Sequence, residues 1–481
     1  MTRAENAPPA RPAGRSRLSL GAKAGMLGLL GALAWWAFDR FPALVFEDDA
    51  YFYAEISGRI LAGQGPSFDG IGPTNGFHPL WMGWLVVAGA GLSALGAGSK
   101  VAFLGAALLP LAGALWLPVL PAAQVLAASL LLGIGMEGLL SALIVLALAR
   151  AIDRRSDPLA APAAAALVLA RIDHLAILAV LAGWAALARP GLLAPLLWGV
   201  ALGAVTSVTV NMALAGLPVG VSALLKGGMA LDRLPQAPAF AAWNLWRSPG
   251  NVVRLVILCA ALVMVMRAAR RDGPLLLHPV LHVACGAFLL MHLLLSDLRD
   301  WYFAVPVIVA LVAGARSMAE RPPGRALLAA YVALTLVLPL AAGAWQLKAT
   351  APERKAMAGF IERIEAELAP GAPLFAADGS GFLAHALGER PVINGDGLVN
   401  TAQYLRNARD PEWLARYLGA RGVHHFAARA LLGPCPTQAV CCPGEAARRL
   451  AATGLAPPLD LVLWRVAEPG LCRLPRGAPQ S

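Results

Sequence analysis

Long apolar runs are the feature of this sequence that most restricts what it can fold into. Several runs reach roughly 18 residues or more with few or no charges, which is long enough to cross a bilayer as a helix. Only 14% of the 481 residues are charged, whereas an ordinary globular domain has about 25%. The sequence therefore predicts a polytopic, all-α membrane domain and excludes a soluble globular enzyme.

The positions of the basic residues predict how the chain enters the membrane. Residues 1–17 precede the first apolar run and carry several arginines against a single acid, so we expect them to be a disordered cytoplasmic tail. The run at 18–38 is too long for a signal peptide, and we interpret it as an uncleaved span. Further spans are expected at 80–95, 101–117, 122–149, 192–213, 252–266, 275–295, 301–315 and 326–345.

The net charge of +11 does not indicate a nucleic-acid partner. The basic residues fall in short clusters between apolar runs rather than in one patch, and no nucleic-acid-binding motif is present. They are better explained as topology signals.

The apolar segment 162–188 decides the topology, because Arg171, Asp173 and His174 lie well inside it. If it crossed once, the arginine clusters at 267–271 and 316–325 would lie outside, against the positive-inside rule. If it enters and returns, these clusters lie inside with the N-terminus. The sequence therefore predicts a hairpin, with about 10–12 spans in all. Its first leg, 162–170, would be about 14 Å long, which places the apex near Arg171 within the membrane or facing a cavity.

The chain changes character at about residue 350, where the apolar runs stop and Glu and Arg return. We expect a membrane domain over 18–348, with an outer loop at 41–79, and a small extracytoplasmic α/β domain over 350–475. Cys435, Cys441, Cys442 and Cys472 suit an oxidising compartment and allow one or two disulfides in three connectivities. A metal site is the competing interpretation of these cysteines.

The outer loop opens with three consecutive acids, Glu47, Asp48 and Asp49. Desolvation and mutual repulsion raise carboxylate pKa values, which favours a proton acceptor that works near neutral pH. The competing interpretation is a solvated loop end or a helix N-terminus, where acids suit the helix dipole.

A family resemblance begins in the same loop, which continues as Asp69 to Trp81, DGIGPTNGFHPLW. This stretch and the acidic cluster resemble the first outer loop of bacterial membrane glycosyltransferases of the GT-C superfamily, the relatives of protein O-mannosyltransferases and aminoarabinose transferases (family 39-like). Other stretches resemble the same, uncharacterised subgroup: GME at 135–137, ARID at 170–173, RDWYF at 299–303 and NGDGLVN at 394–400.

The resemblance implies an inverting transfer of a sugar from a polyprenyl-phosphate-linked donor to an acceptor hydroxyl. The reaction would take place at the outer face of the bacterial cytoplasmic (inner) membrane. Asp48 would be the general base, and Asp49 would orient it or bind a divalent cation such as Mg²⁺ or Mn²⁺. Which of Glu47, Asp48 and Asp49 is the base, and whether a metal is needed, stay open.

The leaving polyprenyl phosphate requires stabilisation, for which the fixed fork of an arginine is suited. Arg171 is the first choice, because an ionisable residue at membrane depth is a functional hypothesis by default. A structural pair with Asp173 is the alternative. Arg299 is a second phosphate candidate, or an interfacial anchor beside its aromatic neighbours.

The remaining candidates each have a structural alternative. His78 would contact phosphate or acceptor, or merely shape the loop before Pro79. Tyr51 and its neighbour Tyr53 would stack on the sugar or anchor the interface.

Glu137 lies inside an expected span and needs a partner or a proton. Asp396 and Asn400 would contact the acceptor, or belong to ordinary Gly-rich turns.

Two other classes of function compete with the transferase. A transporter or flippase would also place acids and arginines in the membrane, but transport sites lie near the midplane between repeated halves, and the sequence has no such repeat. An assembly factor would tolerate loss of Asp48. The acceptor, which is a glycan, a lipid or a protein, and the identity of the sugar stay open.

Overall fold

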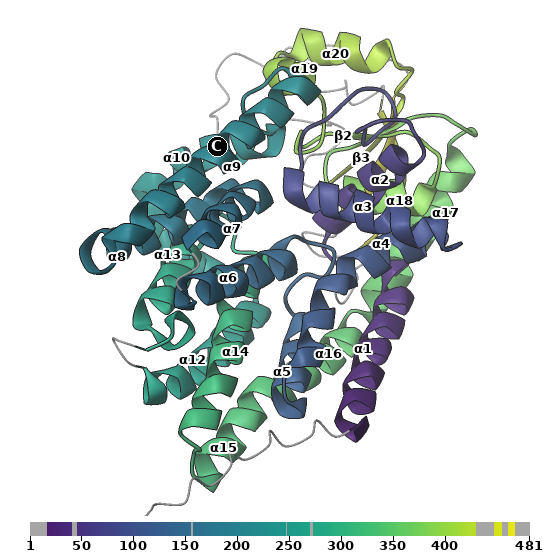
Figure 1. Ribbon diagram of the computed structural model, residues 1–481. Helices are drawn as coiled ribbons and strands as arrows, with labels where there is room; N and C mark the ends of the chain where they lie inside the picture. Colours follow the sequence, from purple (N-terminus) through teal and green to yellow (C-terminus); the bar gives the residue numbers. More distant parts are fainter. Residues whose placement is uncertain are drawn as a thin grey trace, which may run out of the picture.

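The computed structural model describes residues 17–40, 46–154, 157–246, 248–269, 273–429, 447–454 and 460–466. Most of these residues are helical (Figure 1). The helices long and apolar enough to cross a membrane are Leu20–Phe38, Ser99–Trp116, Pro190–Ala215, Pro249–Ala268, Asp300–Glu320 and Arg325–Ala349. The prediction of a helical, multi-pass membrane protein is confirmed, while the side that each end faces stays a prediction.

Among the described residues, the membrane part contains sixteen α-helices, several of which are too short to span a bilayer alone. Their bounds are α1 Arg17–Phe38, α2 Asp48–Leu61, α3 Pro79–Ala94, α4 Ser99–Leu108, α5 Val119–Ser129, α6 Gly138–Asp153, α7 Asp157–Ala170, α8 Leu175–Ala188, α9 Pro190–Ala215, α10 Val221–Arg233, α11 Ala237–Trp246, α12 Pro249–Ala268, α13 Pro279–Leu295, α14 Ala304–Glu320, α15 Arg325–Val332 and α16 Leu338–Ala349.

One expected span is wrong. The apolar run at 122–149 is not one helix, because the chain leaves the helical path between α5 and α6, at residues 130–137. Gly133 and Gly135 adopt φ values of +70° and +94° there, which only glycine accepts readily. The GME stretch, expected inside a span, therefore lies in a break between two short helices.

The chain turns back at Arg171, between α7 and α8. A Cβ atom on Gly199 would meet Ala161 and one on Gly203 would meet Ala165, so α7 and α9 run side by side in the same direction. The Arg189 side chain donates a hydrogen bond to the carbonyl of Ile152 (3.2 Å), which places the start of α9 beside the start of α7. The first leg is longer than expected, because α7 begins at Asp157 rather than near residue 162.

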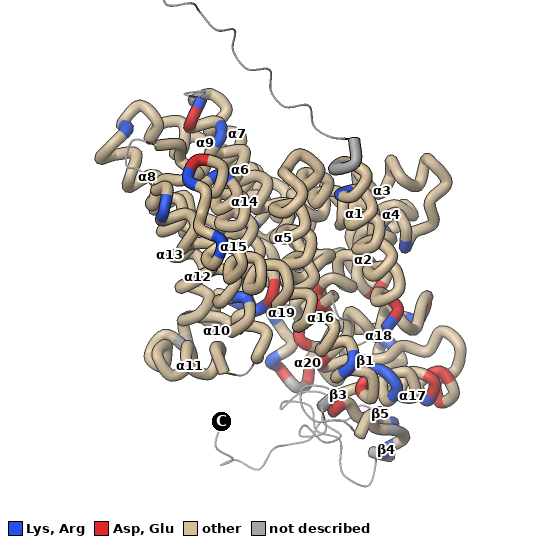
Figure 2. Tube along the Cα trace, turned by 90° about the horizontal axis from the view of Figure 1, so that it is seen from below, with Lys and Arg blue, Asp and Glu red and all other residues tan. Residues whose placement is uncertain are grey.

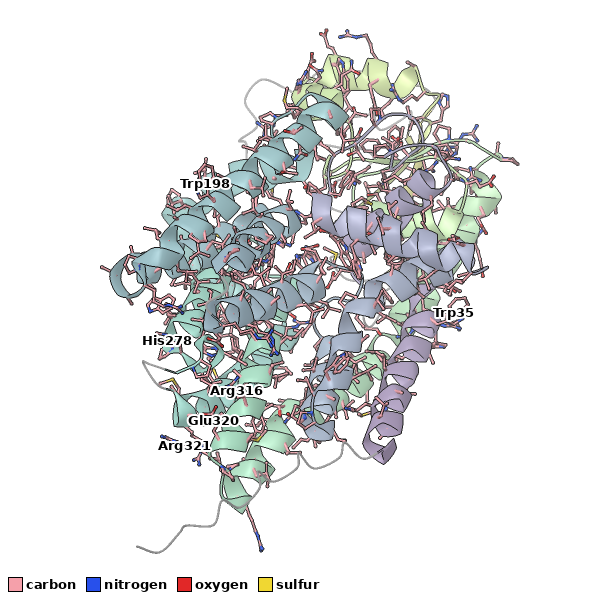
Figure 3. All side chains as sticks on the ribbon, in the orientation of Figure 1. Trp35, Trp198, His278, Arg316, Glu320 and Arg321 are labelled. Carbon is pink, nitrogen blue, oxygen red and sulfur yellow. The ribbon has the colours of Figure 1, made fainter. Side chains whose placement is uncertain are left out.

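Figure 3 shows Arg316 and Arg321, on and just after α14, at the end of the molecule where α1 also begins. The β-strands lie at the opposite end (Figure 1). Charges are absent from α3 and α5 but frequent along the helix that follows the last span, α17 Ala351–Glu367 (Figure 2). The apolar and charged parts of the chain are therefore separated in space as well as in sequence.

The residues after α17 contain a five-stranded sheet of order β2-β1-β3-β5-β4. The strand β1 pairs in parallel with β2 and β3, whereas β3, β5 and β4 are antiparallel neighbours. The bounds are β1 Leu374–Ala376, α18 Ser380–Leu387, β2 Val392–Asn394, α19 Ala402–Asn407, α20 Pro411–Gly419, β3 His425–Arg429, β4 Ala447–Ala452 and β5 Leu461–Val466. Residues 1–16 and the cysteines at 435, 441, 442 and 472, on which the expected tail and disulfides depend, lie outside the described residues.

Candidate functional site

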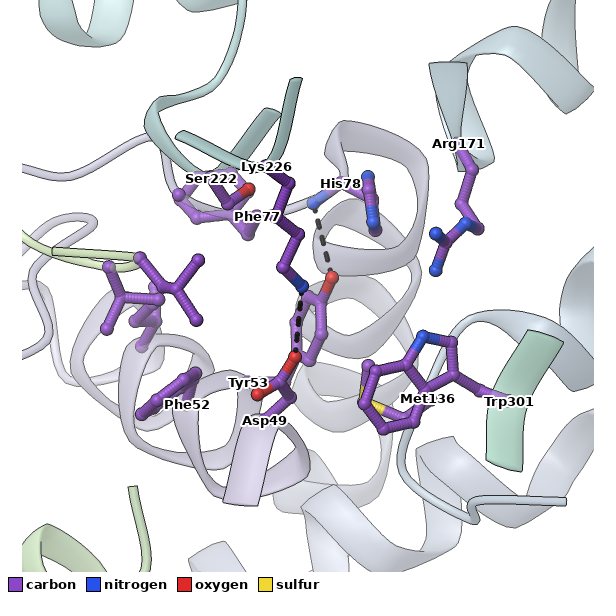
Figure 4. Close-up of a pocket in the computed structure, with 14 residues that line it drawn as sticks. Asp49, Phe52, Tyr53, Phe77, His78, Met136, Arg171, Ser222, Lys226 and Trp301 are labelled. Atoms are coloured by element: carbon purple, nitrogen blue, oxygen red, sulfur yellow. Dashed lines mark hydrogen bonds and ion pairs between the residues drawn. The ribbon is translucent and has the colours of Figure 1, made fainter. Parts of the chain in front are cut away.

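A small pocket, partly open to solvent, lies where the membrane helices meet the C-terminal segment (Figure 4). Each motif stretch of the sequence contributes to its wall: the outer loop, GME, ARID, RDWYF and NGDGLVN. Two further residues come from α10. The lining residues are Asp49, Phe52, Tyr53, Ile56, Gly76, Phe77, His78, Met136, Arg171, Ser222, Lys226, Trp301, Leu398 and Val399.

Asp48 and Asp49 open helix α2, where carboxylates suit the positive end of the helix dipole. Consecutive residues on a helix point about 100° apart, so the two side chains have different surroundings. Asp49 lines the pocket and lies 3.4 Å from the ammonium of Lys226. Asp48 instead accepts hydrogen bonds from the backbone N–H groups of Gly381 (3.3 Å) and Phe382 (2.8 Å), in the first turn of α18.

The carboxyl groups of Asp48 and Glu47 have raised pKa values, as the sequence predicts. Burial raises the pKa of Asp48 well above its ordinary range, and the neighbouring Asp49 adds to this, although the hydrogen bond from Phe382 lowers it. Burial and the nearby Asp300 raise the pKa of Glu47 to about 7, against the opposing effect of Arg299.

Arg171 lies at the apex between α7 and α8, with its guanidinium group between two carboxylates. It forms close ion pairs with Glu137 and Asp173, and its Nε donates to Asp173 Oδ1 at 2.9 Å. The guanidinium carbon also lies 4.7 Å from the centre of the Tyr302 ring. The pair with Asp173, which was the alternative to a phosphate-binding role, is therefore present, and Glu137 joins it.

A histidine on α13, His292, contacts both Asp173 and Tyr302. His292 Nε2 lies 3.1 Å from Asp173 Oδ2, and its ring stacks on Tyr302 with the ring centres 3.7 Å apart. The apex of the hairpin is therefore stabilised by His292 of α13 as well as by contacts between Arg171 and Asp173 of the apex itself.

Glu137 is fully buried, and three groups compensate for its burial. Besides Arg171, the Tyr53 hydroxyl donates to Glu137 Oε2 at 3.5 Å, and His78 Nε2 lies 3.9 Å from Glu137 Oε1. The backbone N–H of His78 donates to the Tyr53 hydroxyl (3.3 Å). Burial lowers the pKa of His78 to about 4, so its ring is neutral at pH 7. Through these contacts Glu137 connects the helix break, in which it lies, to the outer loop and to the hairpin apex.

Some residues that the sequence nominates do not reach the pocket. Tyr51 follows Asp49 by two residues and therefore points to the opposite side of α2, whereas Tyr53, four residues on, shares the pocket face. The Tyr51 hydroxyl is buried and donates to the carbonyl of Phe38 (2.7 Å). Arg299 is largely exposed and pairs with Glu47 at 3.8 Å. Neither side chain lines the pocket.

Asp396 and Asn400 lie beside the pocket, where they shape its wall. Asp396 Oδ1 accepts the N–H of Leu398 (2.9 Å), and Asn400 Nδ2 donates to the Asn394 carbonyl (2.8 Å), so both act as turn residues. The Asn400 carbonyl accepts from the Thr74 hydroxyl (3.0 Å). A Cβ atom on Gly76 would lie only 2.0 Å from the Leu398 carbonyl. The two longest motif stretches thus pack directly on each other.

The sequence-based predictions omit two charged or titratable residues of this network. Lys226 lies in a stretch for which no helix is expected, although the amphipathic pattern of α10 signals one. His292 lies inside the expected span 275–295, where an ionisable residue is itself a functional signal.

A shared metal does not fit the acidic pair, because Asp48 and Asp49 bind different partners. Within the described ranges, no group of three or more His, Cys, Asp or Glu side chains is arranged to hold a metal ion. What the pocket offers is a carboxylate, two cations, a neutral imidazole and aromatic rings.

The pocket therefore combines a group that can accept a proton, Asp49, with two that can bind an anion, Arg171 and Lys226, at the boundary of the apolar helices.

No protein-family model and no curated protein matches the chain.

Proposed function

We propose that this chain is a membrane glycosyltransferase of the GT-C type. It transfers a sugar from a polyprenyl-phosphate-linked donor to an acceptor hydroxyl at the outer face of the bacterial cytoplasmic membrane, with inversion. The observation that carries the proposal is the convergence of all the motif stretches, from Asp49 to Val399, on one pocket. Stretches that merely stabilised separate helices would have no reason to meet.

The position of the pocket supports a lipid-borne donor. One wall comes from helices attached to the apolar bundle, and another from Leu398 and Val399 of the C-terminal segment. A lipid-linked sugar can approach from the apolar side, and the acceptor from the side of the C-terminal segment. The acceptor is a glycan, a lipid or a protein.

The base in this reaction is Asp49. As the acceptor oxygen forms its bond to the anomeric carbon, Asp49 takes the hydroxyl proton, and the bond from that carbon to the phosphate oxygen breaks. The phosphate leaves with the bonding electron pair, and attack opposite to it inverts the anomeric carbon. Asp49 is preferred to Asp48 because the Asp48 carboxylate is bound to α18 and is not part of the pocket wall.

The leaving phosphate is stabilised by the cations of the pocket, Arg171 and Lys226. Arg171 is largely shielded from water, so its positive charge acts more strongly than in bulk solvent, whereas Lys226 is more exposed. The neutral His78 ring lies in the same wall and can donate a hydrogen bond to phosphate or sugar.

A flippase or transporter is the second candidate, favoured by a specific observation. The break between α5 and α6 and the buried Glu137–Arg171–Asp173 network lie among the apolar helices, and such features also occur in transporters. A flippase would move the lipid-linked sugar without breaking its bond to phosphate.

Release of free polyprenyl phosphate separates the two candidates. Membranes that contain wild type, Asp49→Asn or Asp48→Asn, at matched expression, are supplied with labelled polyprenyl-phosphate sugars. We expect release by wild type, a loss of about a hundredfold or more in Asp49→Asn, and retained release in Asp48→Asn, whose amide oxygen still accepts from α18.

If no donor supports release although the lipid binds, the transferase proposal fails. Lipid flipping is then the activity to measure.

A further inference from the structure

The two cations of the pocket are not equivalent. Arg171 is only 7% exposed and is already paired with two carboxylates, Glu137 and Asp173. Lys226 is 42% exposed and, among the described residues, pairs with one carboxylate, that of Asp49, at 3.4 Å. An incoming phosphate therefore has to displace one carboxylate from Lys226 but two from Arg171. Lys226 is also the cation that can reach an approaching ligand without the hairpin apex opening.

Lys226 belongs to a stripe along one face of α10. Ser222, Lys226 and Met229 are four and three residues apart, which places them on the same side of the helix. Ser222 and Lys226 line the pocket, and Met229 continues the stripe beyond it with 39% of its surface exposed. Leu224 and Leu231 lie on the opposite side. Met229 therefore extends this side of α10 beyond the pocket with one exposed apolar side chain.

The start of α10 is fixed to the outer loop. The buried Asn75 accepts the N–H of Val221 through Oδ1 (3.2 Å), and its Nδ2 donates to Asn211 on α9 (2.9 Å). Directly after Lys226, Gly227 and Gly228 have nothing within 4 Å of where a Cβ atom would stand, so packing does not require glycine at either position. Paired glycines weaken a helix. This weak point of α10 directly follows Lys226, which would have to leave the Asp49 carboxylate in order to bind a phosphate.

We infer that α10 binds the donor lipid, with the phosphate on Lys226 and the first part of the isoprenoid chain against Met229. This inference rests on the proposed lipid-linked donor. Binding of the phosphate draws Lys226 away from Asp49, and the carboxylate is then free to accept the proton of the acceptor. Donor binding therefore activates the base, and Asp49 stays neutralised while the pocket has no donor.

The position of the lipid can be tested by photo-crosslinking with polyprenyl phosphate itself. The full-length protein, with benzoylphenylalanine in place of Met229 or, as the matched control, Leu231, is placed in phospholipid nanodiscs with a trace of radiolabelled polyprenyl phosphate. We expect label at position 229 and little at 231. Excess unlabelled polyprenyl phosphate should remove the label, and equal phosphatidic acid should not.

The role of the cation is tested in the same experiment. Lys226→Gln should reduce labelling at position 229 by about tenfold or more, since a charge-assisted hydrogen bond is lost. Lys226→Arg should largely restore it, and Lys348→Gln, a change on α16 away from the pocket, should have no effect. Equal labelling at 229 and 231, competition by phosphatidic acid, or indifference to Lys226→Gln would each overturn the inference.

These outcomes are independent of the transfer assay. Labelling at position 229 that depends on Lys226, without sugar transfer from any donor, would refute the transferase and leave the lipid site standing. Sugar transfer without labelling at position 229 would support the transferase and refute the lipid site on α10.

Discussion

At the scale of single residues, Asp48 and Asp49 are neighbours with different tasks. Asp48 binds residues of α18 that lie 333 and 334 positions away in the sequence, and Asp49 binds Lys226, 177 positions away. The sequence identifies the acidic cluster and predicts the raised pKa values found at Glu47 and Asp48, but it leaves open which carboxylate faces the pocket. That choice depends on partners that are distant in sequence, and no local pattern encodes them.

The hydrogen bonds to Asp48 predict a stability effect. Asp48→Ala leaves the N–H groups of Gly381 and Phe382 without their acceptor and should lower the free energy of unfolding by about 1 kcal/mol. Asp48→Asn keeps one acceptor oxygen, for the shorter bond from Phe382, and should therefore lose less stability than Asp48→Ala. Thermal unfolding of the two variants in detergent measures the difference, and an Asp48→Ala protein as stable as Asp48→Asn would contradict the assignment.

Glu47 predicts a pH dependence of stability. Its pKa rises from 4.5 to about 7 on folding, so the folded chain binds a proton that the unfolded chain has lost. The stabilisation from this group is therefore complete below pH 4.5 and is lost as the pH rises through about 7.

Glu47→Gln should accordingly flatten the fall of the unfolding temperature between about pH 5 and pH 8. Glu365→Gln, a change on an exposed part of α17, is the control and should follow wild type. A Glu47→Gln profile parallel to that of wild type would show that this carboxyl does not titrate there.

At the scale of elements, the break between α5 and α6 is the feature that the sequence conceals. Apart from Glu137, its residues are as apolar as those of a continuous span, so hydropathy does not distinguish it, and only Gly133 and Gly135 hint at it. The freed carbonyls need partners, since water is scarce among the apolar helices. The Arg254 guanidinium donates to the Leu131 carbonyl (2.5 Å), and the Trp81 indole donates to that of Gly135 (3.1 Å). Both donors come from other helices.

Gly135 provides a direct test of the break. Its φ is +94°, and a Cβ atom there would lie 2.8 Å from the Ala50 side chain, next to Asp49. Gly135→Ala should destabilise the protein by about 1–3 kcal/mol and reduce transfer, because α2 must move.

Gly183→Ala is the matched control. Gly183 lies inside α8 with nothing within 4 Å of its missing Cβ atom, so alanine there should be neutral or stabilising by up to about 1 kcal/mol. Equal unfolding temperatures for the two variants would show that Gly135 is not needed for the break.

At the scale of the whole molecule, the apolar runs predict most of the long helices, and the motif stretches predict most of the pocket. Arg171, His78 and Asp49 were named from the sequence and line the pocket together. The amphipathic α10 was missed because it is neither long nor uniformly apolar. Tyr51 and Arg299 were named as a residue that could stack on the sugar and a second phosphate contact, but Tyr51 points to the other side of α2, and Arg299 pairs with Glu47 outside the pocket.

The reversal at Arg171 predicts the sidedness of two loops. Because the starts of α7 and α9 lie together, reporter fusions after Arg154 and after Pro190 should report the same side of the membrane, and we expect the cytoplasm. Fusions of alkaline phosphatase and of green fluorescent protein at both sites measure this. Opposite sides at the two sites would mean that the segment between them crosses once.

The contact between Gly76 and Leu398 has a consequence for when the pocket comes into being. During synthesis the ribosome completes the outer loop first, and residues 398 and 399 emerge only after every membrane helix has been made. Until then the pocket lacks the wall formed by Leu398 and Val399, and before α18 is made Asp48 lacks its hydrogen-bond donors. A chain cut short before this point would insert in the membrane yet lack a closed pocket. Completion of the polypeptide is thus itself the step that assembles the site.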